Sequence, residues 1–361
     1  MDNQKTKHLY EQLLNWYDEN RRILPWREDP SPYHVWLSEI MLQQTRVEAV
    51  REYYALFLDT LPTIEDLAKA DEDVCTKLWQ GLGYYSRVRN LHKAAVQIVE
   101  HHHGNMPDTY DALKKLPGIG PYTAAAIASI CYDERIPAID GNLLRVFSRM
   151  TGYDQDIKST AAKAAATDYY LEIFPENRCG DFNQALMDLG ACVCLPNGAP
   201  LCEKCPWQEH CKAKAEGTCQ QLPVILPKAK RVMEYKTVFL IYYQGKLALR
   251  RRPDKGLLAG LYEYPNTDGN LTASEISDFL RTLGFTSVQA RSLPEAKHIF
   301  SHKEWHMTGW EILADEWEEF ESGVPKEHEL FLASASDLKN IYSIPSAFAK
   351  YTSQIRTDFL D

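Results

Sequence analysis

The chain has 361 residues, of which 45% are hydrophobic and 25% charged, and these values are typical of a globular protein and exclude a disordered or collagen-like chain. The length favours about two domains, and no apolar run of about 18 residues is present, so no membrane-spanning helix is expected. Forty Lys and Arg against 50 Asp and Glu give a net charge of −10, so any contact with DNA must come from local geometry.

The first part of the chain, to about residue 218, has patterns typical of helices. Residues 35–58 contain no Gly or Pro and carry apolar side chains at helical spacing. Further helices are expected from residue 108 and at 123–131, 159–173 and 182–189. Two glycine-containing breaks, Gly81–Gly83 and Pro117–Pro121, interrupt this pattern. The sequence therefore predicts an all-α domain over residues 1–218.

The character of the chain changes near residue 220. Residues 219–234 are polar, contain two prolines and lack periodicity, which indicates a linker. Strand-like residues 237–243, a turn at Gly245 and a second strand at 246–250 then predict a β-hairpin. Another pair of strands is expected within 297–312. Residues 235–361 are therefore expected to form an α+β domain.

Six of the nine cysteines lie between residues 192 and 219. Cys194, Cys202, Cys205 and Cys211 fall within 18 residues, close enough for one loop to surround one metal centre. Soft thiolate ligands suit either Zn²⁺ or an iron–sulfur cluster, and the spacing alone does not separate the two. Cys192 is the alternative first ligand, and ordinary buried cysteines are the alternative to a metal site.

A glycine-rich turn is expected between two helices at residues 116–124. Gly118 and Gly120 permit a tight turn and a close approach of the backbone to another molecule. The backbone N–H groups that begin the following helix can hold a phosphate oxygen without a basic side chain. An ordinary corner between two helices is the alternative, and the pattern has the form of a helix-hairpin-helix DNA-binding element.

Two carboxylates are candidates for acid–base chemistry. Glu39 lies among apolar residues 35–42, where desolvation is expected to raise its pKa and suit it to general acid catalysis, unless it lies on a helix surface. Asp140 follows an apolar run and begins a helix, so it is an N-cap whose ionised form the helix dipole favours. One protonated and one ionised carboxyl form the pairing used in glycosidic bond cleavage.

Together, the Gly118 and Gly120 hairpin, Asp140 about twenty residues later and the cysteine loop resemble the helix-hairpin-helix DNA glycosylases. Residues 36–45, the second domain, and Tyr122 in the place of a lysine of the endonuclease III type are similar to the adenine DNA glycosylase (MutY) family. The resemblance implies a multidomain fold: an all-α glycosylase domain with an iron–sulfur loop at 192–211, followed by an α+β MutT-like (Nudix-like) domain.

The activity that this resemblance implies is base-excision repair by hydrolysis of the N-glycosidic bond of adenine mispaired with 8-oxoguanine or guanine in duplex DNA. Such an enzyme must first extrude the adenine from the base stack. Glu39 would protonate N7 of the base, and Asp140 would stabilise the oxocarbenium-like sugar or act as a nucleophile, with Tyr122 and Asn142 lining the site. Because Tyr122 offers no amine for a Schiff base, a monofunctional glycosylase is expected.

The resemblance also assigns DNA-binding residues. The residues that match the adenine pocket are Arg22, Leu24, Trp26, Arg27, Val47 and Gln184. The residues that match base-stack wedges are Gln44 and Tyr84, the phosphate-binding turn contains Gly118 and Gly120, and the loop that would read 8-oxoguanine contains Phe300, Ser301 and His302. Residues 255–265 keep a Gly and a Glu of the MutT-like family but lack its acidic metal-binding cluster, so recognition without pyrophosphatase activity is expected.

The implied cofactor is a [4Fe–4S] cluster on Cys194, Cys202, Cys205 and Cys211, in preference to zinc. The family usually has six residues between the first two ligands, and this chain has seven. The implied partner is double-stranded DNA with an A:8-oxoguanine or A:G mispair, and the chain is expected to act as a monomer away from any membrane. The polar segment Met1–Lys5 lacks the apolar core of a secretory signal, so a cytoplasmic, nucleoid-associated location of a bacterial type is expected.

Two other functions fit part of the sequence. An endonuclease III-like glycosylase/lyase that acts on pyrimidine lesions or thymine mismatches would share the helical domain, but Tyr122, Gln43–Gln44 and the second domain argue against it. A non-catalytic DNA-binding or redox-sensing protein would share the metal loop, but the presence of both Glu39 and Asp140 argues against it.

Overall fold

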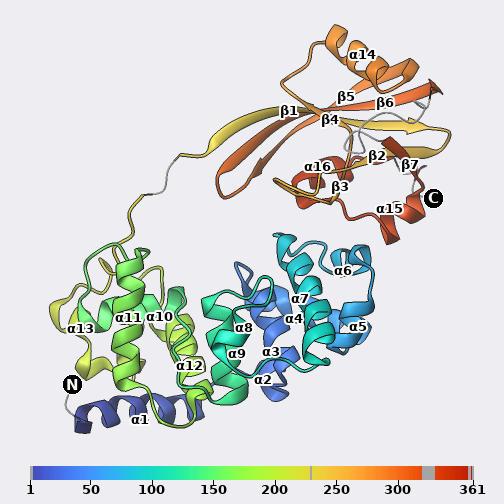
Figure 1. Ribbon diagram of the computed structural model, residues 1–361. Coiled ribbons are helices and arrows are strands. Elements are labelled where there is room, and N and C mark those ends of the chain that lie inside the picture. Colours follow the sequence, from blue (N-terminus) through green and yellow to red (C-terminus); the bar gives the residue numbers. More distant parts are fainter. Residues whose placement is uncertain (1–2, 228–229, 319–329, 357–358, 360–361) are drawn as a thin grey trace. The chain divides into compact units, whose positions relative to one another are not determined.

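The computed structural model describes residues 3–227, 230–318, 330–356 and 359. They divide into two units, one of residues 1–69 and 90–227 and the other of residues 70–89 and 228–361. The first unit is helical and the second contains a β-sheet, which confirms the expected fold class (Figure 1). The domain boundaries at 218 and 235 stay a prediction. Among the described residues, no helix is both long enough and apolar enough to cross a membrane.

The amino-terminal helices confirm the helical pattern but not its continuity. These helices are α1 (Asn3–Asn20), α2 (Pro25–Glu28), α3 (Pro32–Leu42), α4 (Val47–Thr60) and α5 (Ile64–Lys69). The expected uninterrupted segment 35–58 is therefore two helices, separated at residues 43–46. The break occurs without Gly or Pro, because Gln44 adopts a positive φ of 60°, a conformation that the periodicity of apolar residues does not reveal.

The remaining helices in the described residues of the first part of the chain include five that begin close to predicted positions (from residue 108, at 123–131, 159–173 and 182–189, and after Asp140) and three that were not predicted. They are α6 (Glu72–Leu78), α7 (Ser86–His102), α8 (Tyr110–Leu113), α9 (Pro121–Tyr132), α10 (Gly141–Thr151), α11 (Thr160–Ile173), α12 (Cys179–Asp188) and α13 (Lys212–Glu216). The side chains of Thr109, Asp140 and Ser159 each accept an N–H at the start of α8, α10 and α11. These N-caps satisfy backbone donors that would otherwise lack partners and so fix where each helix begins.

Close packing of α9 against α12 sets the floor of the first unit. A Cβ atom on Gly180 would lie 2.6 Å from Cα of Ile130, so the two helices approach to a distance that only glycine permits. The buried amide of Asn183 donates to Ser129 Oγ and to the carbonyl of Ile136, both at 2.8 Å. These contacts fix the direction of α12, whose last turn carries the side chains that enter the pocket described below.

In the part of the second unit that the structure describes, the core is a seven-stranded sheet. Its strands are β1 (Val232–Tyr243), β2 (Lys246–Arg251), β3 (Tyr262–Glu263), β4 (Asn266–Asp268), β5 (Phe285–Ile299), β6 (Lys303–Trp317) and β7 (Leu330–Ala333). The order is β3-β2-β1-β6-β5, with β4 paired to β1 and β7 to β2, and β1 runs parallel to β6. The predicted hairpin is confirmed as β1–β2. The strand pair expected within 297–312 is longer than predicted, and β1 begins inside the expected linker.

Helices cover both faces of this sheet. The helix α14 (Ala273–Thr282) packs Ile276 and Leu280 against one face, and α15 (Ala335–Asn340) and α16 (Ala349–Thr352) lie on the other (Figure 1). A Cβ atom on Gly309 would lie 2.1 Å from the ring of Tyr351, so glycine in β6 is what allows α16 to approach. Alternation along β1 supplies both cores, since Phe239 belongs to one and Leu240 to the other.

Candidate active site

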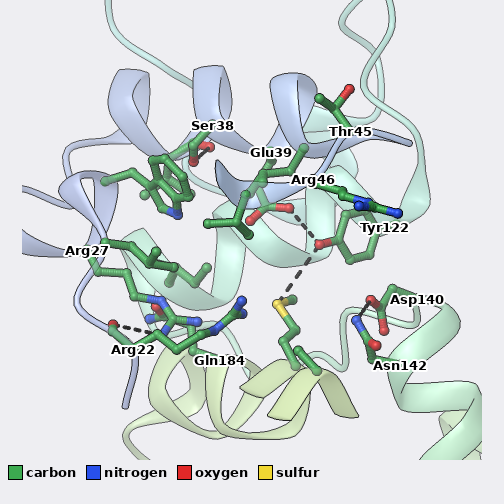
Figure 2. Close-up of a pocket in the computed structure, with 18 of the residues that line it drawn as sticks. Arg22, Arg27, Ser38, Glu39, Thr45, Arg46, Tyr122, Asp140, Asn142 and Gln184 are labelled. Carbon is green, nitrogen blue, oxygen red and sulfur yellow. Dashed lines mark hydrogen bonds between the residues drawn. The ribbon is translucent and has the colours of Figure 1, made fainter. Parts of the chain in front are cut away.

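One pocket in the first unit brings the predicted catalytic and adenine-binding residues together (Figure 2). Its volume is about 350 Å³, within the range of small-molecule sites. The predicted residues that line it are Arg22, Leu24, Trp26, Arg27, Glu39, Val47, Tyr122, Asp140, Asn142 and Gln184. Figure 2 shows Arg22, Arg27 and Gln184 on one side of the pocket and Asp140 and Asn142 on the other. The pocket thus combines a polar wall, formed by Arg22, Arg27 and Gln184, with the two carboxyl groups of Glu39 and Asp140.

Glu39 lies on α3 with only 6% of its surface exposed. The hydroxyl of Tyr122 on α9 donates a hydrogen bond to its Oε2 at 2.6 Å. Burial raises the pKa of Glu39 to about 7, and the nearby Asp140 adds to the rise, whereas the Tyr122 hydrogen bond and the Arg27 charge oppose it. The direction agrees with the desolvation expected from the apolar neighbours in the sequence. A carboxyl group with this pKa can hold a proton near neutral pH and release it.

Asp140 is the N-cap of α10, as predicted. Its carboxylate accepts the N–H of Leu143 at 2.7 Å and the amide of Asn142 at 2.8 Å. Burial nevertheless raises the pKa of Asp140 overall, although these two hydrogen bonds lower it. The helix terminus therefore offsets burial only in part, and the ionised state of Asp140 stays a prediction. The reason is that the carboxyl group is enclosed by the pocket, and desolvation outweighs a helix-end interaction of roughly 0.3–1 kcal/mol.

A buried arginine connects the Asp140 side of the pocket to the cysteine loop. Arg145 donates to Oδ1 of Asn142 at 2.8 Å, to the carbonyl of Cys194 at 2.7 Å and to that of Gly190 at 2.8 Å. A Cβ atom on Gly190 would lie 2.5 Å from Cβ of Asn142, so this glycine is required for the close approach. Arg145 therefore orients the amide that holds Asp140. Sequence reasoning missed it, and its only signal is an arginine on the helix that Asp140 begins.

A second group that sequence reasoning missed is Asp188, at the end of α12. Its residue is fully buried, and its carboxylate pairs with Arg22 at 2.6 Å and with Arg27 at 2.7 Å. The available signal was its spacing, since Asp188 follows Gln184 by four residues and so lies on the same face of the helix. Other lining residues that were not predicted include Ser38, Thr45, Arg46, Glu48 and Met187.

The glycine-rich turn has the predicted geometry. Gly118 has a φ of 75°, and a Cβ atom there would lie 2.6 Å from Cβ of Asn90, so this position requires glycine. Gly120 is the N-cap of α9 and makes no side-chain cap, and nothing lies within 4 Å of a Cβ built on it. The first N–H groups of α9 therefore lack a side-chain cap, which suits an anion. Gln44 is exposed at the α3–α4 break and does not line the pocket.

The three residues predicted to read 8-oxoguanine and the predicted wedge Tyr84 lie in the second unit. Tyr84 has a φ of 48° and is 48% exposed, and its hydroxyl lies 3.2 Å from Oγ of Ser301. The ring of Phe300 packs edge-on against Trp305 with centroids 4.8 Å apart. Tyr84, Phe300, Ser301 and His302 all line a cavity of about 400 Å³. The structure therefore gathers these four predicted residues in one place.

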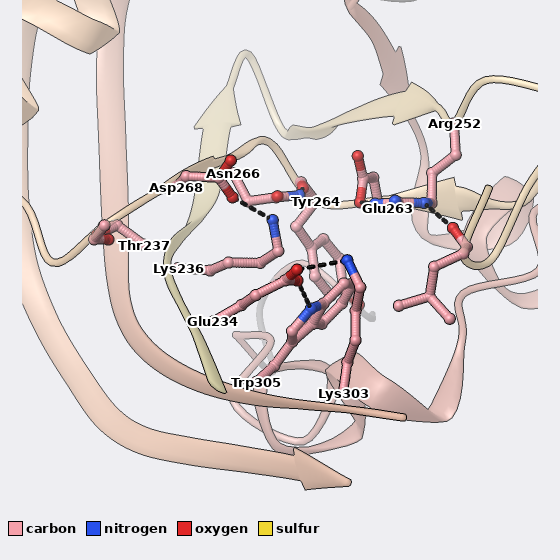
Figure 3. A network of polar contacts seen from close by, with 12 residues as sticks. Glu234, Lys236, Thr237, Arg252, Glu263, Tyr264, Asn266, Asp268, Lys303 and Trp305 are labelled. Carbon is pink, nitrogen blue, oxygen red and sulfur yellow. Dashed lines mark hydrogen bonds and ion pairs between the residues drawn. The ribbon is translucent and has the colours of Figure 1, made fainter. Parts of the chain in front are cut away.

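The charged groups behind this loop are paired with one another (Figure 3). The buried Glu263, the glutamate retained from the Nudix-like segment, accepts from Arg250 at 2.7 Å and from Arg252. Glu234 accepts from the indole of Trp305 at 2.8 Å and pairs with Lys303. These carboxylates hold the strands in place, and Glu234 also holds the ring of Trp305, against which Phe300 packs.

The four predicted cysteine ligands lie near enough to influence one another electrostatically. Burial raises the pKa of the Cys205 thiol to about 12, and the nearby Cys194, Cys211 and Cys202 add to the rise, so the four sulfur atoms are neighbours. Cys192 instead has Arg22, Asp188 and Arg27 as its charged neighbours. In the described ranges, no group of three or more His, Cys, Asp or Glu side chains is arranged to hold a metal ion.

Four cysteine thiolates suit either a zinc ion or an iron–sulfur cluster, and the described residues show no preformed site for either. Nη1 of Arg149 also donates to Sγ of Cys194 at 3.2 Å, a contact that suits a negatively charged sulfur.

Comparisons with known proteins match both parts of the chain. Residues 37–170 match the model of the HhH-GPD superfamily base excision DNA repair proteins, and residues 237–354 match the NUDIX domain. The mouse adenine DNA glycosylase is 36% identical over 350 residues, which cover 80% of this chain and 67% of the relative. The adenine DNA glycosylase of Buchnera aphidicola subsp. Schizaphis graminum is 37% identical over 277 residues, 75% of this chain and 78% of the relative.

The chain belongs to the adenine DNA glycosylase family. It is an adenine-specific DNA N-glycosylase, a hydrolase that binds DNA and removes adenine in base-excision repair. A thermostable thymine-DNA glycosylase of known structure is 28% identical, with a TM-score of 0.54, over 59% of this chain and 98% of its own. An endonuclease III–DNA complex, 17% identical with a TM-score of 0.50, covers 60% of this chain and 98% of its own and shares the fold.

Proposed function

We propose that the enzyme hydrolyses the N-glycosidic bond of adenine opposite 8-oxoguanine or guanine, with Glu39 as the general acid and Asp140 as the group that stabilises the sugar cation. The observation that carries this proposal is that both carboxyl groups line one pocket, where burial raises the pKa of Glu39 to about 7. An extruded adenine fits a pocket of this size. We further propose that the enzyme acts as a monomer.

The polar wall of the pocket suits an adenine ring. The two terminal nitrogens of Arg22 make no hydrogen bond to any residue that the structure describes, so they are available to the acceptor nitrogens of the base. The side-chain amide of Gln184 can accept from the exocyclic amine and donate to a ring nitrogen. Glu39 then transfers its proton to N7, which makes the base a better leaving group.

Bond cleavage follows from this proton transfer. The C1′–N9 bond breaks and its electron pair leaves with the protonated adenine, so positive charge develops on the sugar. Asp140 faces that charge, which favours its ionised form and offsets the effect of burial on its pKa. A water molecule adds to C1′ and gives up a proton, which restores the acid for another turnover.

The same pocket supports hydrolysis without strand cleavage. Tyr122 occupies the position next to Glu39, and burial together with the Glu39 charge raises the pKa of its hydroxyl well above the usual value. No lysine is among the described residues that line the pocket. A Schiff base between the enzyme and the sugar therefore has no nearby amine, and a monofunctional reaction is expected.

For recognition of the opposite base, we propose the loop of Phe300, Ser301 and His302, together with Tyr84. Support comes from the cavity that these residues share and from the contact between the hydroxyls of Tyr84 and Ser301. Hydroxyl and imidazole groups can hydrogen-bond the altered edge of 8-oxoguanine, while Gln44 and Tyr84 are exposed as wedges. The turn at Gly118 and Gly120 would hold a backbone phosphate.

For the metal centre, we propose a [4Fe–4S] cluster on Cys194, Cys202, Cys205 and Cys211. Such a cluster would supply a structural link between the segments of the loop, and it needs no place in the hydrolytic step. Through Arg145, the backbone of Cys194 holds Asn142 beside Asp140, so an ordered loop contributes to the order of the pocket.

The test is a single-turnover assay of free adenine released from duplexes with A opposite 8-oxoguanine, guanine or thymine. We expect release from the first two and little from the third. Release should be lost in both Asp140→Asn and Glu39→Gln, while both variants still bind the duplex. Retained release in either variant would contradict the proposed roles, and strand cleavage at the rate of adenine release would contradict a monofunctional reaction.

A further inference from the structure

The buried carboxylate of Asp188 joins the two arginines of the base pocket. It accepts from the backbone N–H of Arg22 at 3.1 Å and from Nε of the same residue at 2.6 Å. It also accepts from Nη1 of Arg27 at 2.7 Å and from Nη2 at 2.9 Å, a bidentate pair. Four hydrogen bonds to one carboxylate fix both guanidinium groups in position and direction.

The charges in this cluster do not cancel completely. One carboxylate faces two guanidinium groups, and Arg22 and Arg27 keep 30% and 12% of their side chains exposed. The surplus positive charge therefore lies next to the pocket. Arg27, which lies on α2, lowers the pKa of Glu39. Removing the Asp188 charge would leave the two arginine cations without a neutralising carboxylate. The positive electrostatic potential at Glu39 would then be larger.

We propose that Asp188 is a positioning residue for adenine removal: it holds Arg22 and Arg27 against the base and limits the positive charge that reaches the acid. This inference rests on the proposed function of Glu39. Asp188 touches neither the base nor the reacting atoms in this role, since its carboxylate is turned toward the two arginines. Its effect passes through those side chains.

The proposal has two consequences that can be measured separately. Loss of the carboxylate frees both guanidinium groups, so binding of the extruded adenine weakens. It also favours the ionised form of Glu39, so the acid is lost at a lower pH than in the unaltered enzyme. A merely structural role of Asp188 would slow the reaction without moving its pH dependence.

The other groups around Glu39 stay unchanged in this comparison. The titratable and charged side chains that face it or lie at the rim of the pocket are Arg22, Arg27, Arg46, Glu48, Tyr122, Cys131 and Asp140. They come from the segment before α2, from α2, α4 and α9, and from the N-caps of α4 and α10; when Asp188 is substituted, only Arg22 and Arg27 lose a contact. A shift in the alkaline limb of the pH profile, where the rate falls, is therefore assigned to the Asp188–arginine cluster.

The experiment measures single-turnover adenine release against pH for the full chain with its metal centre, in the unaltered enzyme and in Asp188→Asn. We expect the pH at which the rate has fallen to half to drop by about half a unit to one unit. Asp181→Asn is the matched control, because Asp181 lies on the same helix but pairs with Arg178 at the surface. Its half-point should equal that of the unaltered enzyme. An unchanged half-point in Asp188→Asn would overturn the proposal.

A second variant covers the case in which Asp188→Asn fails to fold, as judged by thermal unfolding. Arg27→Gln removes the cation that lowers the pKa of Glu39, so its half-point should rise instead of fall. An unchanged or lower half-point there would also overturn the proposal. Adenine release that persists in Glu39→Gln would remove the proposed function itself, whereas Glu39-dependent release with an unmoved half-point in Asp188→Asn would remove only the role of Asp188.

Discussion

Two buried carboxylates, one in each unit, have opposite surroundings. In the second unit, Glu263 is held by Arg250 and Arg252, and in the first unit Glu39 has a neutral tyrosine hydroxyl as its hydrogen-bond donor. Both are nearly inaccessible, at 2% and 6% exposure. Burial next to guanidinium groups gives a fixed charge that holds strands together, whereas burial without one gives a carboxyl that carries a proton near neutral pH. The partner, rather than burial, therefore separates a structural acid from a chemical one.

The largest effect on the rate of adenine release is expected from a substitution of Asp140, the second buried carboxyl of the pocket. Asp140→Asn keeps the cap on Leu143 but removes the negative charge opposite the sugar. We expect the single-turnover rate of adenine release to fall by about a thousandfold or more, because transition-state charge stabilisation is lost. Duplex binding and thermal unfolding serve as controls and should change little. A fall of less than about tenfold would contradict the assigned role.

A structural carboxylate should behave in the opposite way. Glu263→Gln leaves the half-buried Arg250 and Arg252 without a charged partner, so the free energy of unfolding should fall by about 3–5 kcal/mol. The rate of adenine release at saturating enzyme should stay close to that of the unaltered chain. Denaturant unfolding measures the first quantity, and a large loss of rate without loss of stability would contradict the comparison.

The pKa of Glu39 also predicts a dependence of stability on pH. Because its pKa is raised from the usual 4.5 to about 7 in the folded chain, the folded state binds the proton more tightly than the unfolded state. Ionised Glu39 destabilises the folded state. This destabilisation is absent below pH 4.5 and grows until about pH 7, so the free energy of unfolding of Glu39→Gln should rise by about 3 kcal/mol relative to that of the unaltered chain across this window. Unfolding curves of both chains at several pH values test this; parallel pH dependence would contradict it.

The smallest effect is expected in the loop that reads the opposite base. Ser301→Ala removes one hydroxyl that contacts Tyr84 and lies in the recognition cavity. Loss of a single hydrogen bond costs about 1 kcal/mol, so the preference for 8-oxoguanine over guanine should drop about fivefold. The ratio of the two duplex affinities measures it. An unchanged ratio would show that Ser301 does not read the lesion.

The sequence carries local features of the site well and long-range ones poorly. The apolar run around Glu39 indicates its burial, and the switch to Asp140–Gly141 indicates a helix cap, because neighbours in the chain cause both. Asp188 and Arg22 are 166 residues apart, and only the fold brings them together. The rise in the pKa of Asp140 could not be predicted for the same reason, since the pocket that desolvates this carboxyl is formed by other helices.

The backbone conformation of individual residues also limited what could be predicted from the sequence. The break between α3 and α4 depends on Gln44 in a left-handed conformation, at a site without Gly or Pro. Apolar spacing continues across that break, so the pattern alone predicts one segment. The hairpin at Gly118 is different, because a glycine is required there and its presence in the sequence marks the turn.

The most direct test of Glu39 as the proton donor is the pH profile of single-turnover adenine release from an A:8-oxoguanine duplex. For the unaltered enzyme we predict a rate that falls about tenfold per pH unit above about pH 7, as the acid loses its proton. In Glu39→Gln the rate should be lower by about a hundredfold or more, and that fall should be absent. A fall above pH 7 that persists in Glu39→Gln would contradict the account.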